Sequence, residues 1–310
     1  METNRFHTPV LLEESLSLLR PVPGGTYVDA TVGGGGHAAA VLDKSLPGGR
    51  CIGIDTDREA IAEATTRLAS YGNRFVPVLA NFGTLDSVLA RLSVSEVDGI
   101  LFDLGVSSHQ LDEPSRGFSF RADEPLDMRM DRTQTLHAAE VVNTYTVQEL
   151  TEVIRRFGEE RYAKRVAASI VRSRSKRPLE TTGDLASAIT QTLGHAAGIK
   201  SLARVFQAIR IEVNRELEQL TNGLEHAIRL TRPGGRIVLI SYHSLEDRIV
   251  KNVFREASRA TRPSGTSLLP DVPIRPRVRV LTRKPVEASP FEVRANARAR
   301  SAKLRAAEKL

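Results

Sequence analysis

A run of four consecutive glycines is typical of a turn that binds a ligand. They occupy positions 33–36, after a short β-rich run at 26–31 and before an alanine-rich helix that is expected from His37. Glycine lets the backbone approach a ligand closely, and the free N–H groups at a helix start can bind a polar or anionic group. Asp55 follows about 20 residues later, where an acid can accept a hydrogen bond from a ribose hydroxyl. The pattern predicts a site for a nicotinamide dinucleotide or for S-adenosylmethionine, and a purely structural turn is the competing interpretation.

Asp103 is a second candidate for chemistry. It lies at the end of the apolar run 99–104, and Ser107, Ser108 and Gln110 follow it in a loop of small residues. Open parallel sheets hold their reacting groups at the carboxyl ends of strands. Asp103 can accept a hydrogen bond from a substrate amine or a cofactor amine, which the loop residues would orient. Helix capping by Asp or Ser is the alternative.

Aromatic and basic residues alternate at positions 116–121, where Phe118 and Phe120 lie between Arg116 and Arg121. If the rings are exposed, they suit stacking on unpaired bases while the arginines contact phosphates. If the rings are buried under a long loop, they are ordinary packing. The sequence favours neither interpretation.

His243 lies in a segment that resembles the end of the Asp103 strand. Tyr242, His243 and Ser244 follow the apolar run 236–241 and precede an amphipathic helix. His243 can move a proton or contact a substrate, although a lone histidine is more often a structural hydrogen-bonding group.

The elements that hold these residues alternate between strand and helix. Strands are expected at 26–31, 51–55, 74–79 and 99–104, and helices from His37, at 58–70 and at 85–92. Repeated β-α-β units with apolar strands predict an α/β fold with a parallel sheet covered on both faces. Ligands of such a sheet bind at the carboxyl ends of its strands.

The alternation stops after Asp112. Helical patterns then dominate, including one at 147–176, and the sheet pattern returns after a helix at 205–230 with a strand at 236–242. We therefore expect a first part of the sheet domain at 1–111, a helical insertion at 112–204 and a second part of the sheet domain at 205–310. Residues 277–283 alternate as an edge strand, whereas periodicity leaves 301–310 open between helix and strand.

Basic residues concentrate in two stretches. The chain has 44 Lys and Arg against 37 Asp and Glu, a net charge of +7. Residues 270–310 hold eleven cations and four acids, and residues 155–177 hold nine cations and two acids. Two such stretches on an otherwise acidic chain indicate a polyanion partner, because phosphate contacts gain affinity by counterion release. Two solvated charged faces are the alternative.

Composition excludes several classes of protein. Hydrophobic residues make up 41 % and charged residues 26 % of the 310 positions, as in a globular protein. No apolar run reaches the roughly 20 residues of a membrane span, and the N-terminus lacks a signal pattern, so a cytoplasmic location is expected. Cys51 is the single cysteine and cannot form an internal disulfide. Its position at the start of a strand disfavours cysteine-dependent methylation of a ring carbon, and no group has metal-ligand spacing.

Eight segments together resemble one family of enzymes. They are residues 7–14, 29–37, 103–111, 116–120, 126–131, 158–161, 206–214 and 241–248. They are similar to the ribosomal RNA small subunit methyltransferase H family, whose members use S-adenosylmethionine to methylate N4 of a cytidine in 16S rRNA. The resemblance implies a Rossmann-like methyltransferase sheet with an inserted helical domain.

The resemblance also implies roles for individual residues. The family's cofactor-binding residues fall on Gly35, Gly36, His37, Asp55, Phe82, Asp103 and Gln110. Asp103 and His243 are the candidate catalytic residues, for direct transfer of the sulfonium methyl to the exocyclic amine. The implied partner is 16S rRNA or the small ribosomal subunit, which the enzyme would methylate during rRNA processing. No metal and no membrane are expected, and a homodimer is left open.

Two other functions fit parts of the sequence. A nicotinamide-dependent dehydrogenase would explain the glycine turn and Asp55, but it leaves both basic stretches without a role. A catalytically silent RNA-binding or ribosome-assembly factor would explain the charge distribution, but it does not require the intact glycine turn, Asp55 and Asp103.

Overall fold

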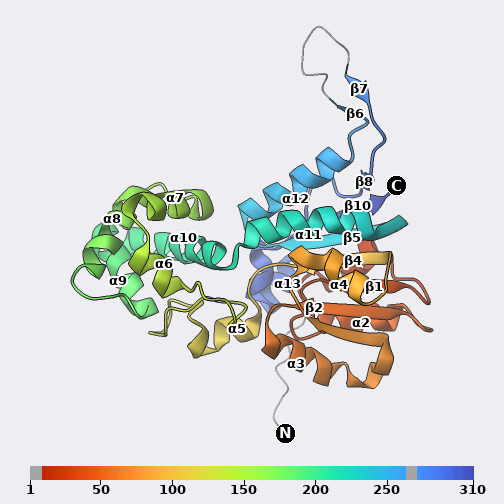
Figure 1. Cartoon of the computed structure of the whole chain (residues 1–310), viewed down its shortest axis with the longest axis horizontal. Coiled ribbons are helices and arrows are strands. Elements are labelled where there is room, and N and C mark those ends of the chain that lie inside the picture. The colour runs from red at the N-terminus through yellow and green to blue at the C-terminus, as the bar shows by residue number, and fades with distance from the viewer. Residues whose placement is uncertain (1–8, 263–270) are drawn as a thin grey trace. The chain divides into compact units, whose positions relative to one another are not determined.

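The computed structural model describes residues 9–262 and 271–310 (Figure 1). It divides into an α/β unit, Met1–Gly105 with Leu217–Leu310, and a helical unit, Val106–Glu216. The expected insertion, 112–204, lies inside the helical unit. The unit is longer at both ends because Val106 and Leu111 pack against the helical core, as does Val213 near the other end. Residues 7 and 8, which begin the first family motif, lie outside the described residues.

The α/β unit is built around one sheet. Its helices are α1 Leu12–Leu19, α2 Gly36–Lys44, α3 Arg58–Arg67, α4 Leu85–Arg91, α11 Glu216–Leu230, α12 Ser244–Ala257 and α13 Pro290–Ala295. Its strands are β1 Thr26–Asp29, β2 Arg50–Asp55, β3 Phe75–Leu79, β4 Val97–Asp103, β5 Thr231–Ser241, β8 Val278–Val280, β9 Val286–Glu287 and β10 Lys303–Lys309, with a separate pair β6 Thr261–Arg262 and β7 Val272–Pro273. The strand order is β3-β2-β1-β4-β5-β10-β8, and β9 pairs with β10.

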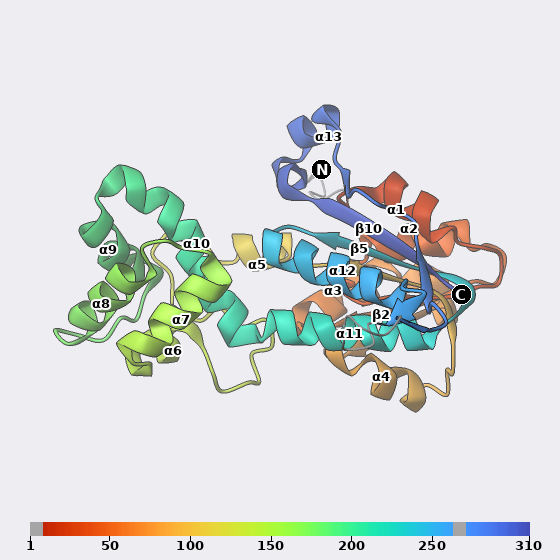
Figure 2. The same ribbon diagram turned by 90° about the horizontal axis from the view of Figure 1, so that it is seen from above.

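Strands β1 to β5 are parallel, so their carboxyl ends lie at one edge of the sheet. Successive residues point to opposite faces. In β5, Ile237 and Leu239 join the core under α4, α11 and α12, while Val238 and Ile240 join the core under α1 (Figure 2). This is the doubly covered α/β arrangement that the apolar strands predict.

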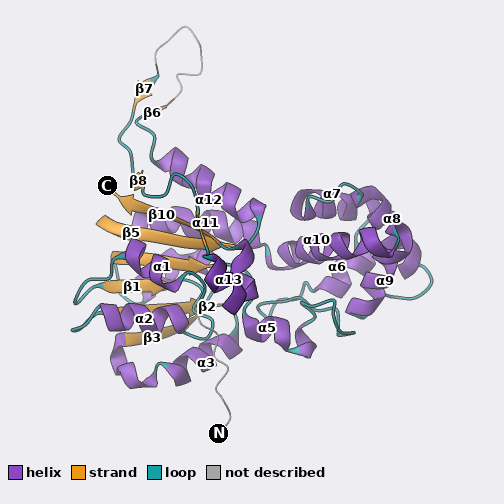
Figure 3. Ribbon diagram, turned by 180° about the vertical axis from the view of Figure 1, so that it is seen from behind, coloured by secondary structure: helices purple, strands orange, loops and turns teal. Residues whose placement is uncertain are grey.

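Strand β10 resolves the ambiguity at the end of the chain. It runs antiparallel between β5 and β8 (Figure 3), and its residues 304–307 are buried. A strand covered on both faces loses the period of two, which is why periodicity did not identify it.

The helical unit holds α5 Ser108–Asp112, α6 Ala138–Thr144, α7 Val147–Gly158, α8 Ala163–Arg174, α9 Thr182–Leu193 and α10 His195–Asn214. Two long predicted helices were wrong in extent. The pattern at 147–176 is broken after Gly158, where Glu159 has φ 48°, and the pattern at 205–230 is broken at Arg215, where φ is 49°. Gly158 directly precedes the first break and was a local signal for it, whereas no Pro or Gly stands next to Arg215. Among the described residues, no helix is both long and apolar enough to cross a membrane.

Candidate active site

The glycine turn joins β1 to α2 at the carboxyl edge of the sheet. Gly33 and Gly35 have φ of 48° and 77°, which other residues adopt only with strain. A Cβ on Gly36 would lie 2.4 Å from Pro9 Cγ, so this position has no room for a side chain. The turn therefore requires glycine for its own geometry, at two left-handed positions and one close approach.

Asp55 at the end of β2 holds this turn. Its Oδ2 accepts the Gly33 N–H at 3.0 Å, and its Oδ1 accepts the Asp57 N–H at 2.9 Å. Burial raises the pKa of Asp55 to about 6, although these backbone hydrogen bonds lower it. The sequence predicted a role in ligand binding alone, and the structure adds a structural role that any substitution must respect.

Asp29 at the end of β1 is a residue that the site prediction missed. It is 2 % exposed, and its Oδ1 accepts the Thr31 N–H at 3.3 Å, while its Oδ2 is buried without a hydrogen-bond partner. Burial raises the pKa of Asp29 to about 7, and the negative charges of Asp103 and Asp55 add to this. Its place at a strand end, like that of Asp55 and Asp103, was the signal that could have found it.

Asp103 at the end of β4 is hydrogen-bonded by Tyr242, a second residue that the site prediction missed. The Tyr242 hydroxyl donates to Asp103 Oδ1 at 2.7 Å, and the Asp103 N–H donates to Thr31 Oγ1 at 2.6 Å. Burial and the charge of Asp103 raise the pKa of Tyr242 above its usual value, so the phenol stays protonated. Tyr242 directly follows β5, the neighbour of β4, and this adjacency was visible only once the sheet order was known.

His37 brings α2 into the same cluster. Its Nε2 lies 3.5 Å from Asp103 Oδ2, at the distance of an ion pair rather than of a short hydrogen bond. Burial lowers the pKa of His37, but the Asp103 carboxylate outweighs burial and raises it. Within the described residues, both ring nitrogens of His37 are buried without a hydrogen-bond partner.

His243 is placed as a helix cap. Its Nδ1 accepts the Glu246 N–H at 3.4 Å, and Glu246 Oε2 accepts the N–H groups of His243 and Tyr242 at 3.3 and 2.8 Å. This reciprocal capping box opens α12 and accounts for the residue types of the segment without chemistry. The hydrogen bonds with Glu246 thus support the structural interpretation of His243, and a catalytic role stays a prediction.

The remaining predicted cofactor residues lie in different units. Phe82 follows β3 in the α/β unit, half-buried, with its ring 5.7 Å from Phe102 in an edge-to-face contact. Gln110 belongs to the helical unit, where it forms a capping box with Ser107 at the start of α5. Their contacts with a cofactor stay predictions.

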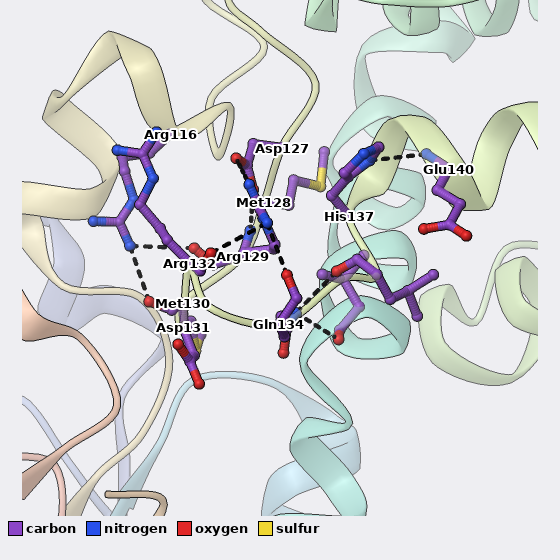
Figure 4. A network of polar contacts seen from close by, with 12 residues as sticks. Arg116, Asp127, Met128, Arg129, Met130, Asp131, Arg132, Gln134, His137 and Glu140 are labelled. Carbon is purple, nitrogen blue, oxygen red and sulfur yellow. Dashed lines mark hydrogen bonds and ion pairs between the residues drawn. The ribbon is translucent and has the colours of Figure 1, made fainter. Parts of the chain in front are cut away.

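The aromatic and basic segment after α5 is internal to the helical unit. Phe118 is 8 % exposed in the helical core, and the half-buried Phe120 packs edge-to-face on Phe206. Arg116 is 1 % exposed and donates to the carbonyls of Arg129 and Met130 at 3.1 and 3.2 Å (Figure 4). Base stacking by Phe118 is therefore wrong, because burial in the core supplies the ring's contacts.

Figure 4 also shows the partners of the charged side chains in this segment. Arg129 forms a two-point ion pair with Asp127, at 2.7 and 2.8 Å, and donates to the carbonyl of Gln134 at 2.8 Å. Asn214 accepts the Met130 N–H and donates to the Met128 carbonyl, both at 2.8 Å. These polar side chains supply hydrogen bonds to the backbone of a long irregular segment, which buried backbone N–H and carbonyl groups require.

The two basic stretches differ in how their charges are used. In the tail, Arg277 pairs with Glu225, Arg279 with Glu308, and the buried Arg305 with Asp247. In the helical unit, Arg161 and Arg165 lie over the ring of Tyr162 at 4.4 and 5.6 Å, and their side chains are exposed. We call Arg161, Tyr162, Lys164 and Arg165 the α8 patch. Its cations have no acidic partner among the described residues, so they are better placed for an external anion.

The cluster at the carboxyl edge fits a cationic, polar ligand. Burial raises the pKa of Asp29, and the nearby charges of Asp103 and Asp55 add to this. Buried polar atoms of Asp29 and His37 lack hydrogen-bond partners, although His37 Nε2 lies 3.5 Å from Asp103 Oδ2. S-Adenosylmethionine offers an amine, a carboxylate and ribose hydroxyls to such atoms. Asp29 and Asp55 are partly protonated at neutral pH, since their pKa values are about 7 and about 6. The negative charge that remains at this edge disfavours a pyrophosphate, so the residues present fit this cofactor better than a dinucleotide.

Comparison with known proteins shows the family of the chain. The model of the MraW methylase family matches residues 4–310. The ribosomal RNA small subunit methyltransferase H of Symbiobacterium thermophilum is 51 % identical over 98 % of this chain and 96 % of its own length. The protein of the same name from Heliobacterium modesticaldum is 48 % identical over 98 % of both chains.

A solved structure, the rRNA methylase from Streptococcus thermophilus, covers 100 % of this chain and 99 % of its own with a TM-score of 0.42. At 11 % identity it adds nothing to the topology described above. The family model and the two relatives extend over nearly the whole chain, across both units. The chain therefore belongs to the MraW methylase family.

Proposed function

We propose that this protein transfers the methyl group of S-adenosylmethionine to the exocyclic N4 amine of a cytidine in the 16S rRNA of the small ribosomal subunit. The observation that carries the proposal is the set of three carboxylates, Asp29, Asp55 and Asp103, at adjacent strand ends beside a glycine turn. A cationic sulfonium and ammonium are attracted to this edge, whereas a nicotinamide dinucleotide brings a pyrophosphate that the edge repels. The names of the relatives support the RNA substrate.

The donor would be held by residues from three strand ends. The turn at Gly35 and Gly36 lets the backbone approach it, and the unpaired Oδ2 of Asp29 and the ring of His37 offer polar partners. Asp55 is half-buried and keeps lone pairs for a ribose hydroxyl beyond its two backbone bonds. Bound S-adenosylmethionine supplies an electrophilic methyl group on a positively charged sulfur.

Asp103 would position the amine of the cytosine. The Tyr242 hydroxyl engages Oδ1, and Oδ2, which lies 3.5 Å from His37 Nε2, keeps a further lone pair that would accept a hydrogen bond from N4. This bond turns the nitrogen lone pair away from ring conjugation and toward the methyl carbon. N4 forms a bond to that carbon, the C–S electron pair leaves with sulfur, and the surplus proton passes from N4 to the carboxylate or to water.

The helical unit would contribute contacts to the RNA backbone. The α8 patch presents exposed cations around Tyr162, which suits phosphates and unpaired bases. The tail contributes less than its charge implies, because Arg277, Arg279 and Arg305 are paired within the protein.

Calorimetric titration of the purified chain tests the cofactor assignment. We expect saturable binding of S-adenosylmethionine and none of NAD, followed by incorporation of labelled methyl into small ribosomal subunits. Binding of NAD alone would instead support the dehydrogenase. RNA binding without affinity for either cofactor would support the silent assembly factor.

A further inference from the structure

Helix α13 exposes an aromatic ring that the fold does not use. Phe291 is 76 % exposed, the largest value among the exposed large hydrophobic side chains of residues 9–262 and 271–310, and it is the aromatic one in that group. The helix itself is anchored, because Glu292 Oε1 accepts the Leu11 N–H at 2.7 Å and Val293 packs against the core under α1. The ring is thus presented to solvent by a helix that is held on its other side.

This helix lies at the edge of the sheet that carries Asp103. Lys303 pairs with Ser241, so the start of β10 is level with the carboxyl end of β5. Figures 2 and 3 show α13 next to that end of β10. From the other side, Pro9 covers Gly36 of the glycine turn, and Leu11, two residues on, binds α13. Helix α13 is therefore close to two parts of the site. One is the start of β10, which pairs with β5 next to the Asp103 strand β4, and the other is the segment Pro9–Leu11, which covers the glycine turn.

The surroundings of the ring are basic. Arg294 is exposed three residues after Phe291, hence on the same side of the helix. Arg300, in the following 3-10 turn Ala297–Ser301, is also exposed. Glu292, the acid of this helix, is engaged by the Leu11 N–H. An exposed ring followed by exposed arginines matches an unpaired base with its phosphates. A second copy of the chain would call for a broad apolar patch, and the helix residues beside the ring, Arg294 and Ala295, do not provide one.

We propose that Phe291 stacks on an unpaired nucleotide of the substrate RNA next to the target cytidine, with Arg294 and Arg300 contacting its phosphates. The inference rests on the proposed function, because it assigns the RNA to the same edge as Asp103. It makes α13 a positioning element: the ring fixes the strand so that the neighbouring cytosine can reach the methyl group.

The test compares substitutions at one position. Phe291→Ala and Phe291→Leu remove the aromatic face, whereas Phe291→Tyr keeps it, and Val22→Ala changes another exposed apolar residue, 43 % exposed, ahead of β1. For each protein, KM and kcat are measured with small ribosomal subunits that lack the methyl group, and the Kd of S-adenosylmethionine is measured by calorimetry. We expect Phe291→Ala and Phe291→Leu to raise KM by about five- to a hundredfold. Phe291→Tyr and Val22→Ala should retain the wild-type KM, and the cofactor Kd should stay unchanged in all four.

Two outcomes would overturn the inference. One is an unchanged KM in Phe291→Ala, whether or not this substitution also converts a wild-type dimer to a monomer. The other is an equal rise of KM in Phe291→Tyr. If the wild type transfers no methyl group to these subunits, the proposed function fails separately. Binding of a fluorescent single-stranded RNA to the wild type and to Phe291→Ala then decides the stacking by itself: weaker binding of the variant supports it, and equal binding overturns it.

Discussion

The two units of the molecule treat their polar side chains differently. In the helical unit, capping boxes at Ser107, Thr146 and Thr181 close the starts of α5, α7 and α9, and the buried Arg116 bonds two carbonyls. At the carboxyl edge of the α/β unit, Asp29 and His37 keep buried polar atoms without hydrogen-bond partners. A buried polar group without a partner costs free energy, so a fold retains it where a ligand completes it. Glu124 Oε2 in the helical unit is also buried without a hydrogen-bond partner, so open polar atoms indicate a candidate site where several gather, as they do at this edge.

We expect the largest effect from substitution of Asp103, the residue that would contact the reacting amine. Asp103→Ala should lower kcat by about 10²- to 10⁴-fold at saturating S-adenosylmethionine, because the amine loses its acceptor. Tyr242→Phe should cost less, about ten- to a hundredfold, since it removes one hydrogen bond to a charged group and leaves the carboxylate. A near-normal kcat for Asp103→Ala would mean that Asp103 serves only to bind the cofactor.

A second prediction concerns the pH dependence of stability. The pKa of Asp29 is about 7 in the folded protein, above its usual 3.8, so the native state binds more protons than the unfolded state between these values. Ionisation of Asp29 should therefore lower the free energy of unfolding as pH rises, by about 2–3 kcal/mol from pH 5 to pH 8. Asp29→Asn removes this contribution, and urea denaturation at both pH values measures it. Equal pH dependence in the two proteins would contradict the burial of an unsatisfied carboxylate.

Asp55→Ala sharpens the comparison within the α/β unit. It should weaken S-adenosylmethionine binding by about 1–3 kcal/mol, the range for removing a hydrogen bond to a charged group, and calorimetry measures the change. Asp43→Ala is the matched control, because Asp43 is an exposed acid at the end of α2 that bonds Tyr71. Unchanged affinity in folded Asp55→Ala would remove Asp55 from the binding site.

The smallest expected effect compares the two basic stretches. Replacing Arg161, Lys164 and Arg165 with Gln should flatten the dependence of log Kd for RNA on log salt, by about 0.7–0.9 for each phosphate that the protein then leaves unneutralised. Replacing Arg277 and Arg279 should change the slope little, because both already pair with acids. A larger change from the second set would reverse the assignment of the α8 patch as the main phosphate-binding surface.

The sequence was most informative where local chemistry determines structure. The glycine turn, the strand ends at Asp55 and Asp103 and the parallel direction of strands β1 to β4 follow from turn residues and apolar runs. The features that the sequence did not predict depend on contacts between distant segments. Tyr242 reaches Asp103 across 139 positions, and the burial of Phe118 depends on helices that follow it in the chain. No local pattern encodes such contacts.

One measurement tests the central claim directly. Small ribosomal subunits lacking the modification are incubated with the enzyme and methyl-labelled S-adenosylmethionine, and the RNA is digested to nucleosides and separated. The account predicts that the label appears in N4-methylcytidine with wild-type enzyme and is lost with Asp103→Ala. Label in a ring-methylated nucleoside, or equal labelling by both proteins, would contradict it.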